Sequence, residues 1–424
     1  MLSSEVMLTW PSDHTHLPGG GFPKTWPAQP SPSRGPPGAQ RFTPGPRSIT
    51  YATCRNGARG WQAVKPILTG RIDDWRGEYA YTLGEQAFVY GFPYIYSAQL
   101  RHAWVTQRRN PSTVPYAPVN HFWHAERLLD ATYRDGGCPN NDTLYSAAWV
   151  NLGDEPVILS HPDMGDRYFA FELVGITSDN FDYVGQRTTG SGAGSFALLG
   201  PGWKGKLPAG VRRVKEAPSP WVLVLGRTLV SGPDDVPRVR ALQEQYRLVP
   251  LSLYGKPDAE VPESRDVLTP IPAAEDPLGP WKTLNAMLAE NPPPSHHEVL
   301  LKQFAQIGVG PGLDVEAQPD AVRQSLVRAA AVGAPMLKQQ TLSGDWAHLV
   351  NGWRYPPPQM GRFGDDFLKR AADQSLLASL PTTRPKRSTW SISRTPTATS
   401  WPQAAGTDCA SRSTRCRRST PCGR

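Results

Sequence analysis

The sequence has few cysteines and no long apolar run. Only 5 of its 424 residues are cysteine, and Cys409, Cys416 and Cys422 all lie near the C-terminus, so we do not expect a disulfide framework. No apolar run reaches the ~20 residues that a membrane helix needs. The first residues, MLSSEVMLTWPSDH, lack the basic and apolar regions of a signal peptide. We therefore expect no transmembrane segment, and the cytoplasm is the default location.

An excess of one charge sign is absent from most of the chain. The formal net charge is +8, from 45 basic and 37 acidic residues. Residues 382–424 contain nine basic residues and one acid, Asp408, which leaves 36 residues of each sign in residues 1–381. Because residues 1–381 carry no net charge, they offer no excess of basic residues for binding nucleic acid. We expect a small-molecule substrate and no nucleic-acid partner, while the oligomeric state stays open.

Apolar periodicity is missing from the N-terminal segment. Residues 1–50 contain ten prolines, six glycines and two acids. Such a segment cannot bury enough apolar surface to offset its ordering entropy. We interpret residues 1–74 as a disordered extension or a misassigned start. The run PSPSRGPP is alternatively a proline-rich ligand for a partner domain.

Regular structure is expected from Trp75 onward. Helical spacing interrupted by Pro93 predicts two short helices. The segments that follow are short, rich in aromatic and branched residues, and separated by Gly, Pro and Asp: TLYSAAWVNL, EPVILS, RYFAFELV, GSFALLG and PWVLVLGRTLV. This pattern predicts an antiparallel β-sandwich over about residues 140–232, inside a first domain at 75–255.

Helical spacing returns after residue 232. Four apolar residues share one helical face, namely Val236, Val239, Leu242 and Tyr246. Further helices are predicted around Trp281, from Ser295 to Gly308, and over residues 320–340. The fold class is therefore mainly β with α: an antiparallel β-sandwich followed by an α-helical domain at 256–345.

Several separated motifs resemble one bacterial family. They are NHFWH at 120–124, Asp135, PNNDTLYS at 139–146, SDNFDYVGQRTTGSGAG at 178–194, LLGPGWKGKLPAGV at 198–211 and GWRYPPPQMGRFGDDFLKRAA at 352–372. Together they resemble the family called domain of unknown function 1254, usually coupled to domain 1214, over residues 80–380. The resemblance implies a β-sandwich, an α-helical middle and a second β domain of jelly-roll type. It implies no catalytic residues.

The second β domain of that family should follow residue 372, but the chain there becomes rich in Arg, Ser, Thr and Pro. We expect only the start of this domain, at 346–381, with Trp353, Phe363 and Phe367 left exposed. Residues 382–424 are expected to be a disordered tail. A frameshift near residues 381–387 explains it, because CRRSTPCG can encode PPVDAVW two bases later, which resembles the lead into a family strand. A natural basic tail is the alternative.

The stretch PNND, residues 139–142, is either a turn or a site. As a turn, Pro fixes φ while Asn and Asp tolerate the left-handed region. As a site, it places Asp142 and Tyr145 at the mouth of the sandwich. His124 is then expected to act as the base, Asp142 to orient it, and Tyr145 or Arg187 to donate to a developing oxyanion. His124 and Asp142 are alternatively the ligands of a divalent metal ion.

Further polar residues are candidates for substrate binding. They are Asn140, Asn141 and Thr143 in the same turn, and Asn180, Arg187 and Thr188 in a glycine-rich loop. Arg187 suits an anionic or polar group, although a long hairpin or an inter-sheet connection that needs positive φ also explains this loop. The loop lacks GxxxxGK[ST], so no nucleotide cofactor is expected. His296 and His297 are expected to be solvated.

Missing motifs narrow the chemistry. The chain lacks GxSxG in a strand–turn–helix context, GxGxxG after a strand, and paired cysteine ligands. The remaining enzymatic hypothesis is a hydrolase of a small carboxylic ester or phosphotriester that uses water activated by a His/Asp pair or a metal ion. The alternative is a non-catalytic cell-envelope protein that binds a carbohydrate or small ligand on an aromatic face with Trp123, Tyr145, Trp149 and Tyr183.

Overall fold

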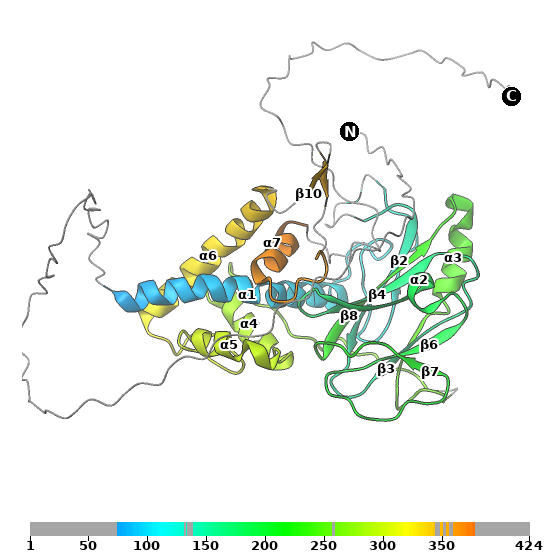
Figure 1. Ribbon diagram of the computed structural model, residues 1–424, viewed down its shortest axis with the longest axis horizontal. Helices are drawn as coiled ribbons and strands as arrows, with labels where there is room; N and C mark the ends of the chain where they lie inside the picture. The colour runs from blue at the N-terminus through cyan, green and yellow to red at the C-terminus, as the bar shows by residue number, and fades with distance from the viewer. Residues whose placement is uncertain are drawn as a thin grey trace, which may run out of the picture. The chain divides into compact units, whose positions relative to one another are not determined.

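The computed structural model describes residues 74–130, 133, 139–256, 259–343, 348–350, 353–355 and 359–377 (Figure 1). All of them belong to one compact unit, Gly70–Arg424. The predicted N-terminal extension up to residue 73 and the predicted tail at 382–424 lie outside the described residues. The same holds for Asp135 and for the side chain of Trp353.

A single long helix opens the described chain. Helix α1 runs from Trp75 to Thr106. Asp74 caps it, because its carboxylate accepts hydrogen bonds from the backbone amides of Arg76 and Gly77. Pro93 lies inside α1 without ending it, so the prediction of two short helices is wrong. An interior proline costs a helix about 3 kcal/mol, and the packing of α1 against α4, α6 and α7 offsets this cost.

Five strands form the first sheet, in the order β1-β2-β8-β4-β5, each antiparallel to its neighbours. Their bounds are Trp123–His124 for β1, Thr143–Asn151 for β2, Phe169–Gly175 for β4, Asn180–Gly185 for β5 and Trp221–Leu229 for β8. Strands β2 and β8 pair along their full lengths, and His124 on the short β1 pairs with Ser146.

Four strands form the second sheet, in the order β7-β6-β3-β9. Their bounds are Val157–His161 for β3, Gly194–Leu198 for β6, Val211–Arg213 for β7 and Arg247–Pro250 for β9. The β6–β7 pair is parallel and the others are antiparallel. Three short helical elements lie between these strands, namely α2 (Gln186–Thr189), η1 (Pro233–Asp235) and α3 (Val236–Gln243).

The two sheets pack face to face around an apolar core. Phe171 and Val224 from the first sheet meet Leu159 and Phe196 from the second. This packing confirms the predicted sandwich and the predicted fold class. Strand β9 was not predicted, because the segment RLVP is short and contains both a charged residue and a proline.

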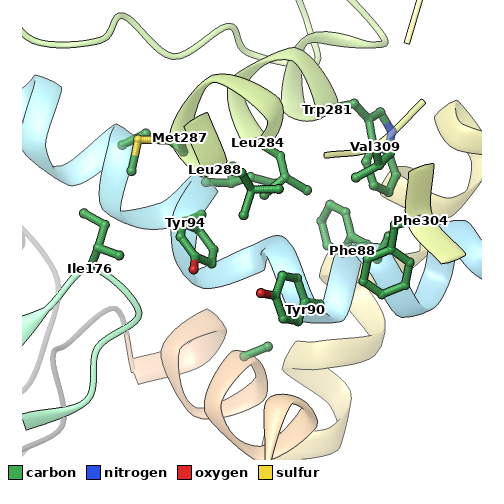
Figure 2. Packing of buried hydrophobic residues seen from close by; sticks show 14 of the residues in the cluster. Phe88, Tyr90, Tyr94, Ile176, Trp281, Leu284, Met287, Leu288, Phe304 and Val309 are labelled. Carbon is green, nitrogen blue, oxygen red and sulfur yellow. The ribbon is translucent and has the colours of Figure 1, made fainter. Parts of the chain in front are cut away.

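Helices pack on part of the other face of the first sheet. They are α4 (Gly279–Glu290), η2 (Ser295–His297), α5 (Glu298–Ala305), α6 (Asp320–Ser343) and α7 (Phe367–Leu377), together with α1. Trp149 and Trp221 of the sheet share one core cluster with Trp281 and Leu284 of α4. Figure 2 shows part of this cluster, with Phe88 of α1 toward Trp281 of α4 and Tyr90 on the side of α7.

Residues 348–377 contain a short hairpin and a helix. Strands β10 (His348–Val350) and β11 (Trp353–Tyr355) pair with each other. Phe363 is buried, and Phe367 is half-buried against the helical core. The expectation that both phenylalanines are exposed is therefore wrong, because the turn before α7 folds back onto the sandwich and α1. Among the described residues, no helix is long and apolar enough to cross a membrane.

Candidate functional site

A pocket of about 360 Å³ lies where the helices meet the first sheet. Its lining comes from α1, from the β4–β5 turn, from the loop before β8, from the loop between α4 and α5, and from the segment that leads into α7. The lining residues are Tyr90, Tyr94, Ile176, Thr177, Asp179, Pro218, Ser219, Asn291, Pro292, Pro294, His296, His297, Gly364, Asp365 and Arg370. Segments far apart in the sequence thus surround one small space.

Three side chains that can bind a metal ion or move a proton meet at this pocket. His296 Nε2 lies 3.2 Å and His297 Nε2 lies 3.1 Å from the same atom, Asp365 Oδ1. The three ligand atoms lie within 4.8 Å of one another. Within the part of the chain that the structure describes, this is the only cluster of three or more His, Cys, Asp or Glu residues with such spacing.

Aromatic packing fixes the imidazole ring of His297. The residue is only 7% exposed, and its ring packs edge-on against Tyr90 and Phe367, with centroids 5.5 and 5.2 Å away. Tyr90 Oη lies 3.1 Å from His297 Nδ1. Both ring nitrogens of His297 therefore have partners, Tyr90 on one side and Asp365 on the other.

His296 and Asp365 are the solvent-exposed members of the cluster. Their side chains are 61% and 66% exposed, and His296 Nδ1 has no hydrogen-bond partner among the described residues. Hydrogen bonds from His297 and His296 lower the pKa of the Asp365 carboxyl. Asp365 therefore stays ionised at neutral pH and can orient an imidazole or bind a cation.

Asp365 is held in a turn that is anchored to the first sheet. The backbone amide of Phe363 donates to Asp179 Oδ1 at 2.7 Å. Gly361 and Gly364 adopt φ values of 72° and 56°, a region that glycine reaches without steric cost. The turn can therefore reverse direction twice within four residues and present Asp365 to the histidines.

An ion pair strengthens the same anchor. Arg370 Nη2 lies 2.5 Å from Asp179 Oδ2, and the backbone amide of Asn180 donates to the Gly361 carbonyl at 2.8 Å. Burial raises the pKa of Asp179, while Arg370 acts in the opposite direction. Two of the motifs quoted for the family resemblance, at 178–194 and 352–372, thus meet at the pocket wall.

The pocket also holds a buried hydroxyl. Burial raises the pKa of Tyr94 to about 12, and burial likewise raises the pKa of Tyr90. Both hydroxyls keep their protons at neutral pH. Figure 2 shows the two rings on neighbouring turns of α1, so Tyr94 lies beside the residue that contacts His297.

The structure places His124 and Asp142 in different surroundings. His124 lies between the rings of Phe122 and Tyr246, and its Nδ1 is 2.8 Å from Ser146 Oγ. Asp142 precedes β2, where its backbone carbonyl accepts from the Val230 amide. No hydrogen bond joins the two side chains in the described residues. Their catalytic and metal-binding roles stay predictions.

The other residues of the PNND turn have mainly structural contacts. Asn140 Oδ1 accepts from the amide and the hydroxyl of Thr143, at 3.0 and 2.7 Å, and Tyr145 Oη accepts from the Asn140 amide at 2.9 Å. Asn141 is exposed in the turn. Because these contacts close the turn onto β2, they match the turn interpretation, and none of these residues lines the pocket.

The glycine-rich segment contains β5 and α2 and connects the first sheet to β6 of the second sheet. Thr188 Oγ1 donates to the Tyr183 carbonyl at 2.9 Å, and the exposed Arg187 packs over the ring of Tyr168. Asn180 is buried on β5 next to Asp179. The structure brings neither Arg187 nor Thr188 to the pocket lining.

The proposed aromatic face is packed inside the molecule. Trp123, Trp149 and Tyr183 are buried, and Trp149 belongs to the core shared with the helices. These three rings stabilise the fold and do not form an exposed ligand platform, while Tyr145 is half-buried.

His297, His296 and Asp365 were missed as site residues. The expectation of two solvated histidines holds for His296 but is wrong for His297, because Tyr90 and Phe367 enclose its ring. The available signal was the pair of adjacent histidines together with the acidic pair in GRFGDDF. Sequence spacing alone could not join them, because 69 residues separate His296 from Asp365.

Comparisons with known proteins concern the fold and one segment. Residues 119–250 match the family described as "Protein of unknown function (DUF1254)". This range contains Asp179 in the β4–β5 turn and Ser219 in the loop before β8, both of which line the pocket, while His296, His297 and Asp365 lie outside it. No protein among the curated ones matches this chain.

Two solved structures match parts of this chain. A crystal structure of a protein from Vibrio parahaemolyticus is similar with a TM-score of 0.50 and 21% identity, over 70% of this chain and 66% of that one. This chain thus spans just under two thirds of that protein, and the likeness concerns the fold alone. An uncharacterised protein from Burkholderia cenocepacia has a TM-score of 0.23 and 12% identity, over 59% and 56% of the two chains.

Proposed function

We propose that the chain is a hydrolase of a small carboxylic ester or phosphotriester and that the pocket is its active site. The observation that carries this proposal is the His296–Asp365–His297 cluster at the wall of a pocket of about 360 Å³. A base, a carboxylate that orients it, and room for a small substrate occur together there.

His296 is the group that activates water in a metal-free reaction. Its Nε2 lies against the ionised Asp365, so the other nitrogen can accept a proton and the resulting imidazolium is stabilised. The hydroxide attacks the carbonyl carbon or the phosphorus atom. His296 then returns the proton to the departing alkoxide oxygen, and the products are an acid and an alcohol. His297 positions Asp365, because both of its own nitrogens are engaged.

Tyr94 is the candidate donor to the negative charge that develops in the transition state. It lines the pocket, and its raised pKa keeps the proton on the hydroxyl. A hydrogen bond to a developing oxyanion contributes more in a water-poor pocket than in bulk solvent. Ile176, Pro218 and Pro292 in the pocket lining provide apolar contacts that suit a small neutral ester.

The test is ester hydrolysis by the purified full chain and by four variants. We expect turnover of p-nitrophenyl acetate or butyrate, or of diethyl p-nitrophenyl phosphate, and a loss of at least about 100-fold in kcat/KM for His296→Ala and Asp365→Asn. Asp366→Asn is the matched control, since Asp366 caps α7 through the Lys369 amide and does not line the pocket. If His124→Ala abolishes turnover while Asp365→Asn retains it, the site is at the sandwich mouth and the pocket assignment is wrong.

A non-catalytic small-ligand protein is the second candidate. The tyrosine and proline lining of the pocket favours it, because such walls are rigid before a ligand arrives. Saturable binding of the same esters without turnover by the folded wild-type chain would support this second function and contradict the first.

The proposal also extends to the C-terminal region. We propose that residues beyond about 381–387 are read out of frame and that a second β domain like domain 1214 belongs in their place. The nine basic residues and single acid of residues 382–424 support this idea. Resequencing the gene through codons 375–424 tests the proposed frameshift. An unchanged reading frame would contradict it.

A further inference from the structure

We infer that His296 Nε2, His297 Nε2 and Asp365 Oδ1 bind one divalent transition-metal ion of the Zn²⁺ class at the pocket. This inference deepens the proposed function, because it names a cofactor for the same site. The donor set suits it: neutral imidazole and carboxylate are common ligands of Zn²⁺ and its neighbours, whereas Mg²⁺ and Ca²⁺ prefer oxygen ligands alone.

Two of the three separations in the cluster match a metal site, and all three ligand atoms lie within 4.8 Å of one another. With bonds of about 2.0 to 2.1 Å, two ligands of a tetrahedral Zn²⁺ ion lie about 3.3 Å apart. The observed separations between Asp365 Oδ1 and the two imidazole nitrogens are 3.2 and 3.1 Å. Adjacent residues on a helical turn normally diverge. Here both imidazoles reach one oxygen, so an ion can take up the position between all three atoms with small movements.

The surroundings add a second, independent feature. A metal-binding histidine usually has a hydrogen-bond partner on its other nitrogen, which fixes the ring orientation. Tyr90 Oη occupies that position for His297 Nδ1 at 3.1 Å, and the Asp179–Phe363 hydrogen bond anchors the turn that carries Asp365. His297 is thus fixed by burial, while the exposed His296 can adjust to the ion.

Three protein ligands leave a coordination position for water or substrate. Zinc sites with three protein ligands are typical of catalysis, because the bound water loses a proton near neutral pH. His296 and Asp365 are largely exposed and line the pocket. In this form of the site His296 is a metal ligand, and the ion takes over the activation of water.

The test measures binding of Zn²⁺ and Co²⁺ to chelator-treated full chain by equilibrium dialysis and visible absorption. We expect one equivalent in the wild type and a loss of affinity of at least about tenfold in His296→Ala and in Asp365→Asn. Both residues are exposed, so the variants should keep the wild-type unfolding midpoint. Asp366→Asn is the matched control and should bind like the wild type.

Two results would overturn the inference. One is the absence of Zn²⁺ and Co²⁺ binding to the folded wild type. The other is equal binding by the wild type and both ligand variants, as expected for zinc held by Cys409, Cys416 and Cys422 instead. Ester hydrolysis is measured separately: turnover by a folded chain that binds no Zn²⁺ or Co²⁺ rejects the metal site and keeps the hydrolase, whereas metal binding without turnover keeps the metal site and rejects the hydrolase.

Discussion

Two histidines of the sandwich are enclosed by aromatic rings, unlike the exposed His296 at the pocket. His124 lies between Phe122 and Tyr246, and His161 lies among phenylalanine rings. Each has Nδ1 2.8 Å from one oxygen, of Ser146 and Pro162 respectively. Burial lowers the pKa of both, that of His124 to about 4 with smaller contributions from Arg247 and Arg240. Both are therefore neutral at pH 7, and their protonation opposes folding.

This burial predicts acid sensitivity that His124→Phe should reduce. The unfolded chain takes up the proton near pH 6.5, but the folded chain does so only near pH 4. The stability that the neutral imidazole contributes is present above pH 6.5 and is lost as the pH falls toward 4. From pH 7 to pH 5 the wild type should lose about 1.5 to 2 kcal/mol of unfolding free energy through this group.

Phenylalanine suits this position because the neighbours are aromatic, and Ser146 keeps its hydrogen bond from Gln243. Urea unfolding at pH 7 and pH 5 provides the comparison. An equal drop in unfolding free energy for wild type and variant would show that His124 is not the titrating group.

At the scale of elements, the close contact between α1 and α4 depends on a glycine. A Cβ atom at Gly91 would lie 2.3 Å from Leu284 Cδ2 and 2.7 Å from Cδ1. Gly91→Ala should therefore cost about 1 to 3 kcal/mol of unfolding free energy through overpacking, even though alanine favours a helix by ~1 kcal/mol.

Gly77→Ala in the same helix is the matched control. There a Cβ would meet only side-chain atoms of Asp74 and Ser325, none closer than 3.0 Å, so we expect unchanged or slightly raised stability. Denaturant unfolding of both variants measures the difference. A neutral Gly91→Ala would mean that α1 and α4 pack less tightly than the structure indicates.

The elements were predictable where local pattern decides them. Short segments rich in aromatic and branched residues, now β2, β4 and β8, identified the sandwich, and α6 was expected close to its observed bounds of Asp320 and Ser343. Pro93 led to the wrong prediction of two short helices, because the burial of α1 in the core outweighs the local cost of a proline. Strand β9 was missed because its pairing with β3 depends on a distant partner.

At the scale of the whole molecule, the site is assembled from segments that no local pattern connects. Tyr90, Asp179, His297 and Asp365 come from α1, the β4–β5 turn, η2 and the turn before α7. PNND was predicted as a site because its polar residues are contiguous. In the structure, the hydrogen bonds between Asn140 and Thr143 close a turn. Two family-like motifs did contain Asp179 and Asp365, yet only the fold shows that they lie at one pocket.

The central claim is that this pocket is where the chemistry occurs. The most direct measurement is a crystal structure of the full chain with a bound phosphonate analogue of ester hydrolysis. We expect the phosphonate oxygens beside His296 and Tyr94, with density for an ion between the two histidines and Asp365 when Zn²⁺ is supplied. A phosphonate bound instead at the sandwich mouth, beside His124 and Asp142, would contradict it.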